Sequence, residues 1–297
     1  MKLAPIIVFA FNRLVPLKKC IETLLANEES KFSDLYVFVD GARVNKDGEY
    51  DKVKCVQEYV KKITGFKSLT YEFSDTNKGL ADSIISGVSK IINEYGDAII
   101  LEDDLEFSTG FLRYMNDALI QYKSAHNIFS ISGHSLKISI PSDYLYNTYL
   151  HTRSDSWGWA TWKDRWNSVD WRLDDWNEVK KNKKAFKKWA GSDVYKMIND
   201  WHRGGVNSWA IRFCYSQFIQ ERYSVFPFKS KVINNGFLFD GTNCRGYNRY
   251  KIVLDENNEP DIFVPENVIN KKIINRVLYY DSIIMRIKSR FLSLLLR

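Results

Sequence analysis

The chain has 297 residues, of which 45% are hydrophobic and 27% are charged. This balance excludes a disordered or fibrous protein and allows one large α/β domain with an appendage. The net charge of +7 is concentrated at the end of the chain, where residues 271–297 hold seven Lys or Arg and one Asp, so we expect no nucleic-acid partner.

The N-terminal residues form a short apolar run, residues 3–10, which Pro5 interrupts. The run is too short for the core of a signal peptide, and no segment reaches the roughly 18 unbroken apolar residues of a transmembrane helix. The four cysteines are widely spaced and form no CxxC pair, which predicts neither a zinc site nor a disulfide framework. We therefore expect a cytoplasmic protein with reduced thiols.

The first half of the chain alternates between short apolar runs and segments with helical periodicity. The runs predict strands at residues 6–10, 35–39, 69–73 and 98–101. Apolar residues recur every three or four positions in residues 17–25, 50–63 and 80–92, which predicts three helices. This order is typical of βαβ units, so we predict an α/β fold with a mostly parallel central sheet flanked by helices.

Polar residues follow three of the predicted strands, at Asn12, Asp40 and Asp103. In open α/β sheets, ligands bind outside the carboxyl ends of the strands, where the connecting loops meet. We therefore expect these three residues to lie near a ligand site.

Three consecutive carboxylates, Glu102, Asp103 and Asp104, directly follow the strand at 98–101. Such crowding is costly unless a cation or hydrogen-bond donors offset the charge. Carboxylates are preferred ligands of Mg²⁺ and Mn²⁺, which keep waters and substrate phosphates as further ligands. The cluster predicts a divalent metal that stabilises a departing diphosphate. The alternative is an acidic loop that caps the next helix.

All nine tryptophans lie between Trp157 and Trp209. Large aromatic side chains commonly fill the core between a sheet and its helices. Some of these rings could instead form flat platforms for sugars, and the residues alone leave both interpretations open.

Four short motifs in this order resemble the GT-A glycosyltransferases: residues 9–13, 39–41, 77–80 and 101–106. With Trp-Gly-Trp-Ala-Thr-Trp at 157–162, the chain is most similar to the N-acetylglucosaminyltransferases that start complex N-glycans and to bacterial sugar transferases with this tryptophan motif. The resemblance covers roughly residues 4–245. It implies a GT-A fold in residues 1–265, with a nucleotide-binding half at 1–106 and an acceptor-binding half at 107–265.

The same resemblance implies a UDP-sugar donor and a bound Mn²⁺ or Mg²⁺. Asp40 would accept a hydrogen bond from a uracil-type ring nitrogen. Four residues after the first strand complete the implied nucleoside pocket: Ala10, Phe11, Asn12 and Arg13.

The remaining donor contacts are implied for two loops. Lys78 and Gly79 resemble a segment that closes over the nucleotide, although a plain turn is the alternative for both. Asp103 would lie near the ribose or the metal, Asp104 would ligate the metal, and Glu102 would support them.

Trp157, Gly158 and Trp159 resemble the segment beside the donor sugar and the acceptor, where glycine permits a close approach of the backbone. Packing in the core is the alternative for both tryptophans. Ser208 and Trp209 match the stretch that carries the base in the N-glycan enzymes, but there the base is an aspartate. The serine departs from the family pattern.

Two aspartates therefore replace it as candidates for the catalytic base, Asp155 and Asp240. Inverting transfer needs a carboxylate that removes a proton from the acceptor hydroxyl; the alternative for both is a role in a turn. Related enzymes often supply a late histidine to the metal, and Asn243 could take that place here. His134 could line the cleft, but we expect a core or loop histidine.

The tail, residues 266–297, is predicted to be a basic amphipathic helix from Lys272 onward. Basic side chains would form one narrow stripe and apolar side chains a neighbouring face. Such a helix could lie on an anionic membrane, or it could dock on its own domain or on a dimer partner.

Taken together, the resemblance implies a glycosyltransferase that moves a hexose or an N-acetylhexosamine from a UDP-sugar to a saccharide or lipid-linked oligosaccharide, with inversion favoured. The expected setting is bacterial surface polysaccharide assembly, as in O-antigen or capsule, in the cytoplasm or at the inner face of the cell membrane. Two alternatives remain. One is a calcium-dependent carbohydrate-binding protein, and the other is a sugar nucleotidyltransferase, although the first loop lacks the glycines typical of that class.

Overall fold

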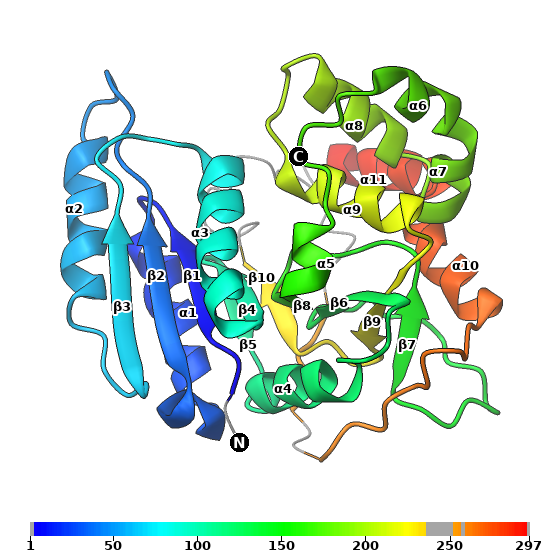
Figure 1. Cartoon of the computed structure of the whole chain (residues 1–297), viewed down its shortest axis with the longest axis horizontal. Helices are drawn as coiled ribbons and strands as arrows, with labels where there is room; N and C mark the ends of the chain where they lie inside the picture. The colour runs from blue at the N-terminus through cyan, green and yellow to red at the C-terminus, as the bar shows by residue number, and fades with distance from the viewer. Residues whose placement is uncertain (1–2, 236–251, 257–258, 296–297) are drawn as a thin grey trace.

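The computed structural model describes residues 3–235, 252–256 and 259–295. Its centre is an eight-stranded sheet with the strand order β3-β2-β1-β4-β8-β6-β9-β7. Figure 1 shows this sheet running through the molecule with helices on both sides. The predicted class, an α/β fold with a central sheet flanked by helices, is confirmed.

The first half of the sheet consists of four parallel strands: β1 (Ile6–Ala10), β2 (Asp34–Val39), β3 (Ser68–Phe73) and β4 (Asp97–Glu102). The crossovers are α1 (Leu14–Leu25) with the short η1 (Glu28–Phe32), α2 (Glu49–Val60) and α3 (Leu80–Tyr95). All four strands and all three helices predicted from the sequence are present. The first helix begins before Pro16 because a proline in the first turn costs no helical hydrogen bond.

The second half mixes strand directions. It contains β6 (Ile128–Ser132), β7 (Thr148–His151), β8 (Trp159–Trp162) and β9 (Tyr223–Pro227). β8 is antiparallel to both β4 and β6, and β7 is antiparallel to β9. A separate two-stranded sheet pairs β5 (Leu105–Phe107) with β10 (Val232–Asn234). Because β8 runs against β4, the loop before β8 lies at the same edge of the sheet as the end of β4.

Helices complete the layers. Alternate residues of β1 point to opposite faces, so Ile6 and Val8 join one core and Ile7 and Phe9 join another. The second half contributes α4 (Phe111–Gln121) to the first core and α5 (Lys163–Asn167) and α9 (Trp209–Ile219) to the other. Three further helices, α6 (Trp176–Lys181), α7 (Lys183–Ala190) and α8 (Val194–His202), pack against α9 around a smaller cluster.

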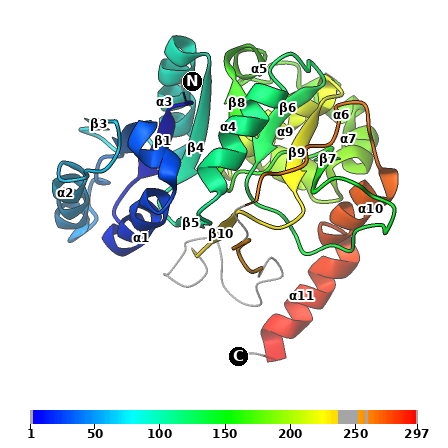
Figure 2. The ribbon, with the colours of Figure 1, turned by 90° about the horizontal axis from the view of Figure 1, so that it is seen from below.

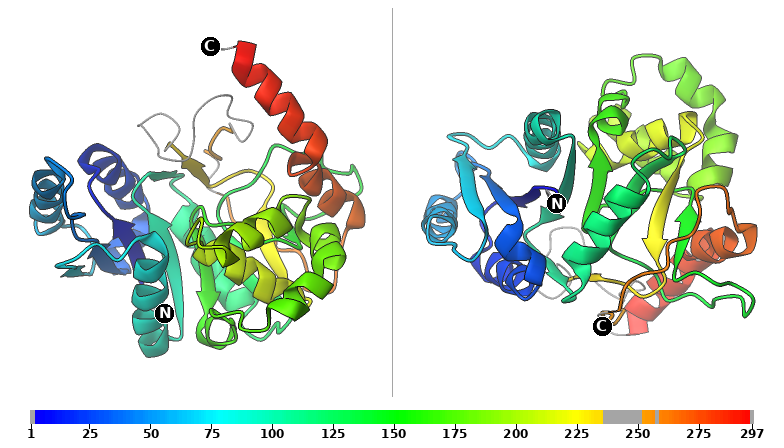
Figure 3. Two further views of the ribbon diagram at one scale, coloured as in Figure 1. Left: turned by 90° about the horizontal axis from the view of Figure 1, so that it is seen from above. Right: turned by 60° about the horizontal axis from the view of Figure 1, so that its bottom comes forward.

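The tail forms two helices, α10 (Lys271–Tyr280) and α11 (Ile283–Leu295). The prediction of one continuous helix is therefore wrong. The chain leaves the helical path at Asp281, and the Oγ of Ser282 accepts a hydrogen bond from the amide of Met285 at 3.2 Å, which caps the new helix. α10 docks on its own domain through Ile273 and Val277, whereas α11 extends away from the body (Figures 2 and 3). Within the described residues, no helix is long and apolar enough to span a bilayer.

Candidate functional site

The acidic cluster lies where β4 ends. β1 and β4 are neighbours in the sheet, so Arg13, just after β1, reaches both aspartates of the cluster. Its Nη2 forms an ion pair with Asp103 Oδ1 and lies 3.0 Å from Asp104 Oδ2. The structure thus brings together Arg13, Asp103 and Asp104, which the sequence places near one ligand.

One guanidinium does not balance this cluster. Burial raises the pKa of Glu102 to about 8, with further contributions from Asp104 and Asp103. Burial also raises the pKa of Asp103 to about 6, although Arg13 opposes this shift. Both groups are therefore held in surroundings that disfavour their charged forms, and a bound cation would relieve that cost.

Two carboxylate oxygens of the cluster are available to such a cation. Oδ2 of Asp103 and Oδ1 of Asp104 are buried, and neither has a hydrogen-bond partner in the described part of the chain. Over the same residues, no group of three or more His, Cys, Asp or Glu could hold a metal. A pair of aspartates fits Mg²⁺ or Mn²⁺, because these ions commonly take one or two carboxylates and complete their shell with water and phosphate.

Asp40 has a different role from the one expected. Its Oδ1 accepts from the amides of Gly41 and Lys78 at 2.9 and 2.8 Å, and its Oδ2 accepts from Asn77 Nδ2 and the Gly79 amide at 3.0 and 2.9 Å. A carboxylate offers about four acceptor positions. All are occupied, so Asp40 has none left for a nucleobase and instead fixes the 77–79 loop to the end of β2.

Lys78 and Gly79 lie in this fixed loop. The φ of Gly79 is +80°, a conformation that favours glycine, and the residue is the N-cap of α3. The Lys78 side chain is exposed and borders a small cavity of about 120 Å³ together with Asp40 and Lys90. The 77–79 loop thus has a fixed conformation at the carboxyl end of β2, where it borders this cavity.

The residues at the carboxyl end of β1 lie next to this loop, because β1 and β2 are neighbours in the sheet. Ala10 is buried at the end of the strand. The guanidinium of Arg43 lies 5.5 Å from the centre of the Phe11 ring. The side-chain amide of Asn12 donates to Glu49 Oε1 at 3.1 Å, and Glu49 also accepts from the Arg43 amide. No sequence signal marks Arg43 or Glu49, because they lie in and directly after a loop with no recognisable pattern.

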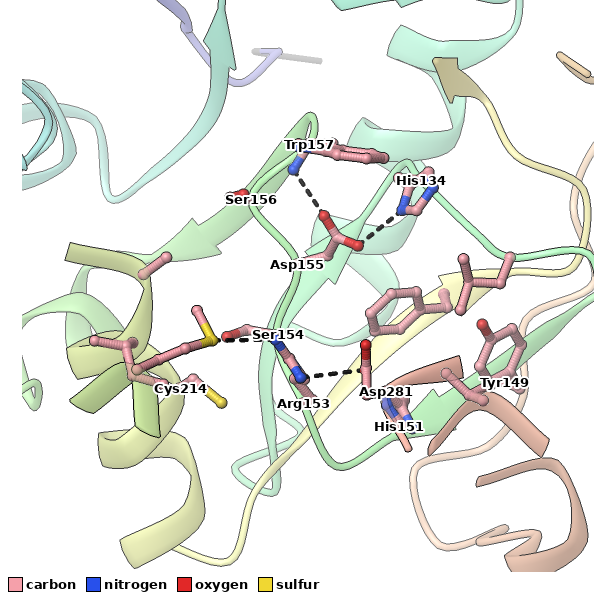
Figure 4. A pocket seen from close by; sticks show the side chains of 16 residues that line it. His134, Tyr149, His151, Arg153, Ser154, Asp155, Ser156, Trp157, Cys214 and Asp281 are labelled. Atoms are coloured by element: carbon pink, nitrogen blue, oxygen red, sulfur yellow. Dashed lines mark hydrogen bonds and ion pairs between the residues drawn. The ribbon is translucent and has the colours of Figure 1, made fainter. Parts of the chain in front are cut away.

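A larger cavity of about 220 Å³ opens beside the loop that precedes β8. Figure 4 shows Asp155, His134 and Trp157 at one end of it and Arg153 with Asp281 at the other. Asp155 is the candidate base in this cavity. It is also close enough to the acidic cluster for its charge to contribute to the raised pKa of Glu102, so the two groups of residues share one region.

Asp155 is held by two hydrogen bonds. Its Oδ2 lies 2.8 Å from Nδ1 of His134, and its Oδ1 accepts from the Trp157 amide at 2.8 Å. Burial alone would raise the pKa of Asp155, but the charge and hydrogen bond of His134 and the Trp157 amide lower it. The carboxylate is thus kept ionised and oriented, which a base requires. His134 is buried, as expected for a core histidine, and it also lines the cavity.

The tryptophans of the motif have different positions. Trp159 is 1% exposed and Trp209 is 4% exposed, and their rings stack 4.9 Å apart in the core. Neither ring has a free face for a sugar, so packing accounts for both. Trp157 is only partly buried and borders the cavity. It contacts the His134 ring edge-on, with the two ring centres 4.5 Å apart.

Two further predicted residues have structural explanations. Gly158 has φ +62°, and a Cβ there would come within 2.9 Å of Val232 Cγ2, so glycine permits a turn against β10. Ser208 caps α9 by accepting from the Ile211 amide. Asp240 and Asn243 lie outside the described residues.

A search against models of protein families finds no match, and a search of curated proteins finds none either. Among solved structures, the mannosyltransferase PcManGT from Pyrobaculum calidifontis, in complex with GDP-Man and Mn²⁺, is similar at 11% identity and a TM-score of 0.35, over 55% of this chain and 45% of that chain. S. aureus TarS is similar at 11% identity and a TM-score of 0.43, over 78% of this chain and 36% of that chain. This chain spans less than half the length of either protein.

Proposed function

We propose that this chain is a metal-dependent glycosyltransferase of the GT-A type that transfers a hexose or an N-acetylhexosamine from a UDP-sugar to a saccharide. The observation that carries the proposal is a pair of buried oxygens on Asp103 and Asp104, at the carboxyl end of β4, that have no hydrogen-bond partner among the described residues. The GT-A motifs of the sequence support it, because they occupy the loops that meet at this edge. We assign donor binding to residues 1–106, acceptor binding to 107–265 and a separate role to 266–297.

The chemistry divides between the two groups of residues. A divalent cation held by Asp103 and Asp104 would neutralise the charge that develops on the departing diphosphate. Arg13, paired with both aspartates, adds a positive charge at the same place. Phe11 and Asn12 would lie beside the nucleoside, and the 77–79 loop, which Asp40 holds in place, would form the other side of the donor pocket.

Asp155 is the proposed base. It accepts the proton of the acceptor hydroxyl while that oxygen attacks the anomeric carbon from the face opposite the diphosphate, which inverts the configuration. His134 and the Trp157 amide orient its carboxylate. The Trp157 ring, which borders the same cavity, is placed to lie against the acceptor sugar.

The first test is a panel of UDP-sugars, with release of UDP measured in the presence of Mn²⁺, Mg²⁺ or a chelator. We expect turnover that requires the metal and falls by about 100-fold or more in Asp104→Asn, because the charge on the leaving group is then less well stabilised. Asp143→Asn, at an exposed aspartate in the connection between β6 and β7, is the matched control and should keep full activity.

Unchanged activity of Asp104→Asn in chelator would overturn the proposal. The same panel separates the alternatives. Pyrophosphate release from a nucleoside triphosphate would indicate a nucleotidyltransferase, and calcium-dependent glycan binding without UDP release would indicate a carbohydrate-binding protein. Surface polysaccharide assembly, including O-antigen and capsule, is the proposed setting, and lipid-linked oligosaccharides are the acceptors to test first.

A further inference from the structure

The exposed face of α11 is apolar. Five large side chains point away from the protein, each between 56% and 69% exposed: Ile283, Ile284, Ile287, Phe291 and Leu294. At about 100° per residue they fall within one stripe of roughly 100° along the helix. The less exposed side chains, such as Met285 and Ser289, lie on the other side. The helix therefore presents to its surroundings the face that an amphipathic helix normally buries.

Positive charges border this stripe. At the same helical spacing, Lys288 lies on one edge of the stripe and Arg290 lies on the other, and both are exposed. The sequence of α11 contains no Asp or Glu. Arg286 lies beyond Arg290 on the same flank of the helix, donates to Ser192 Oγ at 2.9 Å and anchors the start of the helix to its own domain.

α10, the helix before α11, packs its apolar face on the domain. α10 buries Ile273 and Val277 against Leu136, Tyr149, Phe226 and Phe228. α11 does not continue this contact after the break at Asp281, and it projects from the body (Figure 2). The exposed stripe is thus a separate surface.

We propose that α11 lies in the interface of an anionic lipid bilayer, with its apolar stripe among the acyl chains and Lys288 and Arg290 at the level of the phosphates. Amphipathic helices with basic residues beside a large apolar face bind membranes in this way. The alternative occupant, a second α11 from another copy, is disfavoured. Symmetric pairing would bring the basic edges together, and the helix has no carboxylate to balance them.

This position has a consequence for the cavity that holds Asp155. Asp281, directly before α11, lines that cavity and forms an ion pair with Arg153 at 3.1 Å. Ser192 Oγ donates to the Asp281 carbonyl at 2.8 Å. The N-terminal end of α11 is therefore held against the wall of the cavity. This last step rests on the proposed function: on a membrane, the cavity would lie close to the lipid headgroups, where a lipid-linked acceptor is found.

The test is flotation of the full chain with vesicles of pure phosphatidylcholine or of equal parts phosphatidylcholine and phosphatidylglycerol. We expect binding to the anionic vesicles that weakens by about tenfold or more in high salt, in Lys288→Glu/Arg290→Glu and in Ile287→Glu/Phe291→Glu. Ile120→Glu, a change at a half-exposed position on α4, is the matched control and should bind like the unmodified chain.

Binding that survives Ile287→Glu/Phe291→Glu, or no binding by the unmodified chain, would overturn the inference. A third outcome would also overturn it: the unmodified chain does not bind vesicles but sediments as a dimer, and Ile287→Glu/Phe291→Glu dissociates that dimer. The assay uses no donor sugar, so its result is independent of the proposed activity. Conversely, the rate of UDP release during sugar transfer to a water-soluble acceptor should stay the same in the α11 variants, which separates a failure of this inference from a failure of the proposed function.

Discussion

At the scale of single residues, the site depends on carboxylates that are kept in different states. Asp103 and Asp104 are crowded, and each has one buried oxygen with no partner in the part of the chain that the structure describes, so they gain most from a cation. Asp155 is paired with His134 and two hydrogen bonds hold its carboxylate in place. Such a separation of environments is how one site can hold a metal at one carboxylate pair and use another carboxylate as a base.

The pair of Asp155 and His134 can be tested by its pH dependence. Asp155→Asn should lower kcat by about 100-fold or more, because the acceptor loses its base. His134→Gln removes the charge that lowers the pKa of Asp155 and leaves the burial that raises it. The acidic limb of the kcat/KM profile should therefore move to higher pH in this variant, and activity should recover in alkaline buffer.

A purely structural role for His134 would reduce activity at every pH without moving the limb. The thermal unfolding midpoint of both variants provides the control for folding. If Asp155→Asn keeps full activity, Asp240 becomes the remaining candidate for the base, and it lies outside the described residues.

At the scale of elements, the loop between β3 and α3 has no regular structure and depends on Asp40. Three backbone amides and one side-chain amide donate to this single carboxylate. Removal of the carboxylate would take the acceptor from the three backbone amides and one of two acceptors from Asn77, whose Nδ2 also donates to the Gly41 carbonyl at 2.8 Å. A donor that loses its acceptor costs free energy. Asp40 thus sets the shape of the loop that borders the proposed donor pocket.

We expect Asp40→Ala to lower the free energy of unfolding by about 3 kcal/mol, because several donors lose their acceptor together. Urea denaturation measures this loss. Asp75→Ala, an exposed aspartate in the same connection, is the matched control and should change stability little. The opposite pattern, a stable Asp40→Ala variant with a selective loss of UDP affinity, would restore the role of Asp40 as a nucleobase acceptor.

At the scale of the whole molecule, the raised pKa values of the acidic cluster link stability to pH, and we expect a bound metal to change that dependence. The folded-state pKa values of Glu102 and Asp103, about 8 and about 6, lie above their ordinary values. The folded protein therefore binds protons more tightly at these groups than the unfolded chain does. Their contribution to stability is present at low pH and is lost as the pH rises through the folded-state values.

For the metal-free protein, we expect the cluster to make the free energy of unfolding, measured in urea, higher near pH 5 than near pH 8. Saturating Mn²⁺ should reverse the trend, because the ion binds the ionised carboxylates and stabilises the folded state. The double variant Glu102→Gln/Asp103→Asn isolates the cluster. Its stability should change less between the two pH values and should not respond to Mn²⁺, and an unchanged pH dependence in this variant would contradict the assignment.

Much of the first half of the fold is readable from the sequence because its signals are local. Hydrophobic periodicity in residues 6–101 is sufficient to place four strands and three helices, and the end of the fourth strand places Glu102, Asp103 and Asp104 at a ligand-bearing edge. The same local pattern identifies α11 as basic and amphipathic, but it does not show the break at Asp281, since both sides of the break follow helical spacing.

The tertiary structure alone decides which of the candidate residues are available. The donors that occupy Asp40 include residues 37 to 39 positions further along the chain, and His134 meets Asp155 across 21 positions. Trp159 and Trp209 stack in the core although their sequence context equally suits a sugar platform. Contacts between residues so far apart in the sequence depend on how strands and helices pack, so the spacing of residues cannot predict them. The direction of the apolar face of α11, outward rather than onto the domain, is decided in the same way.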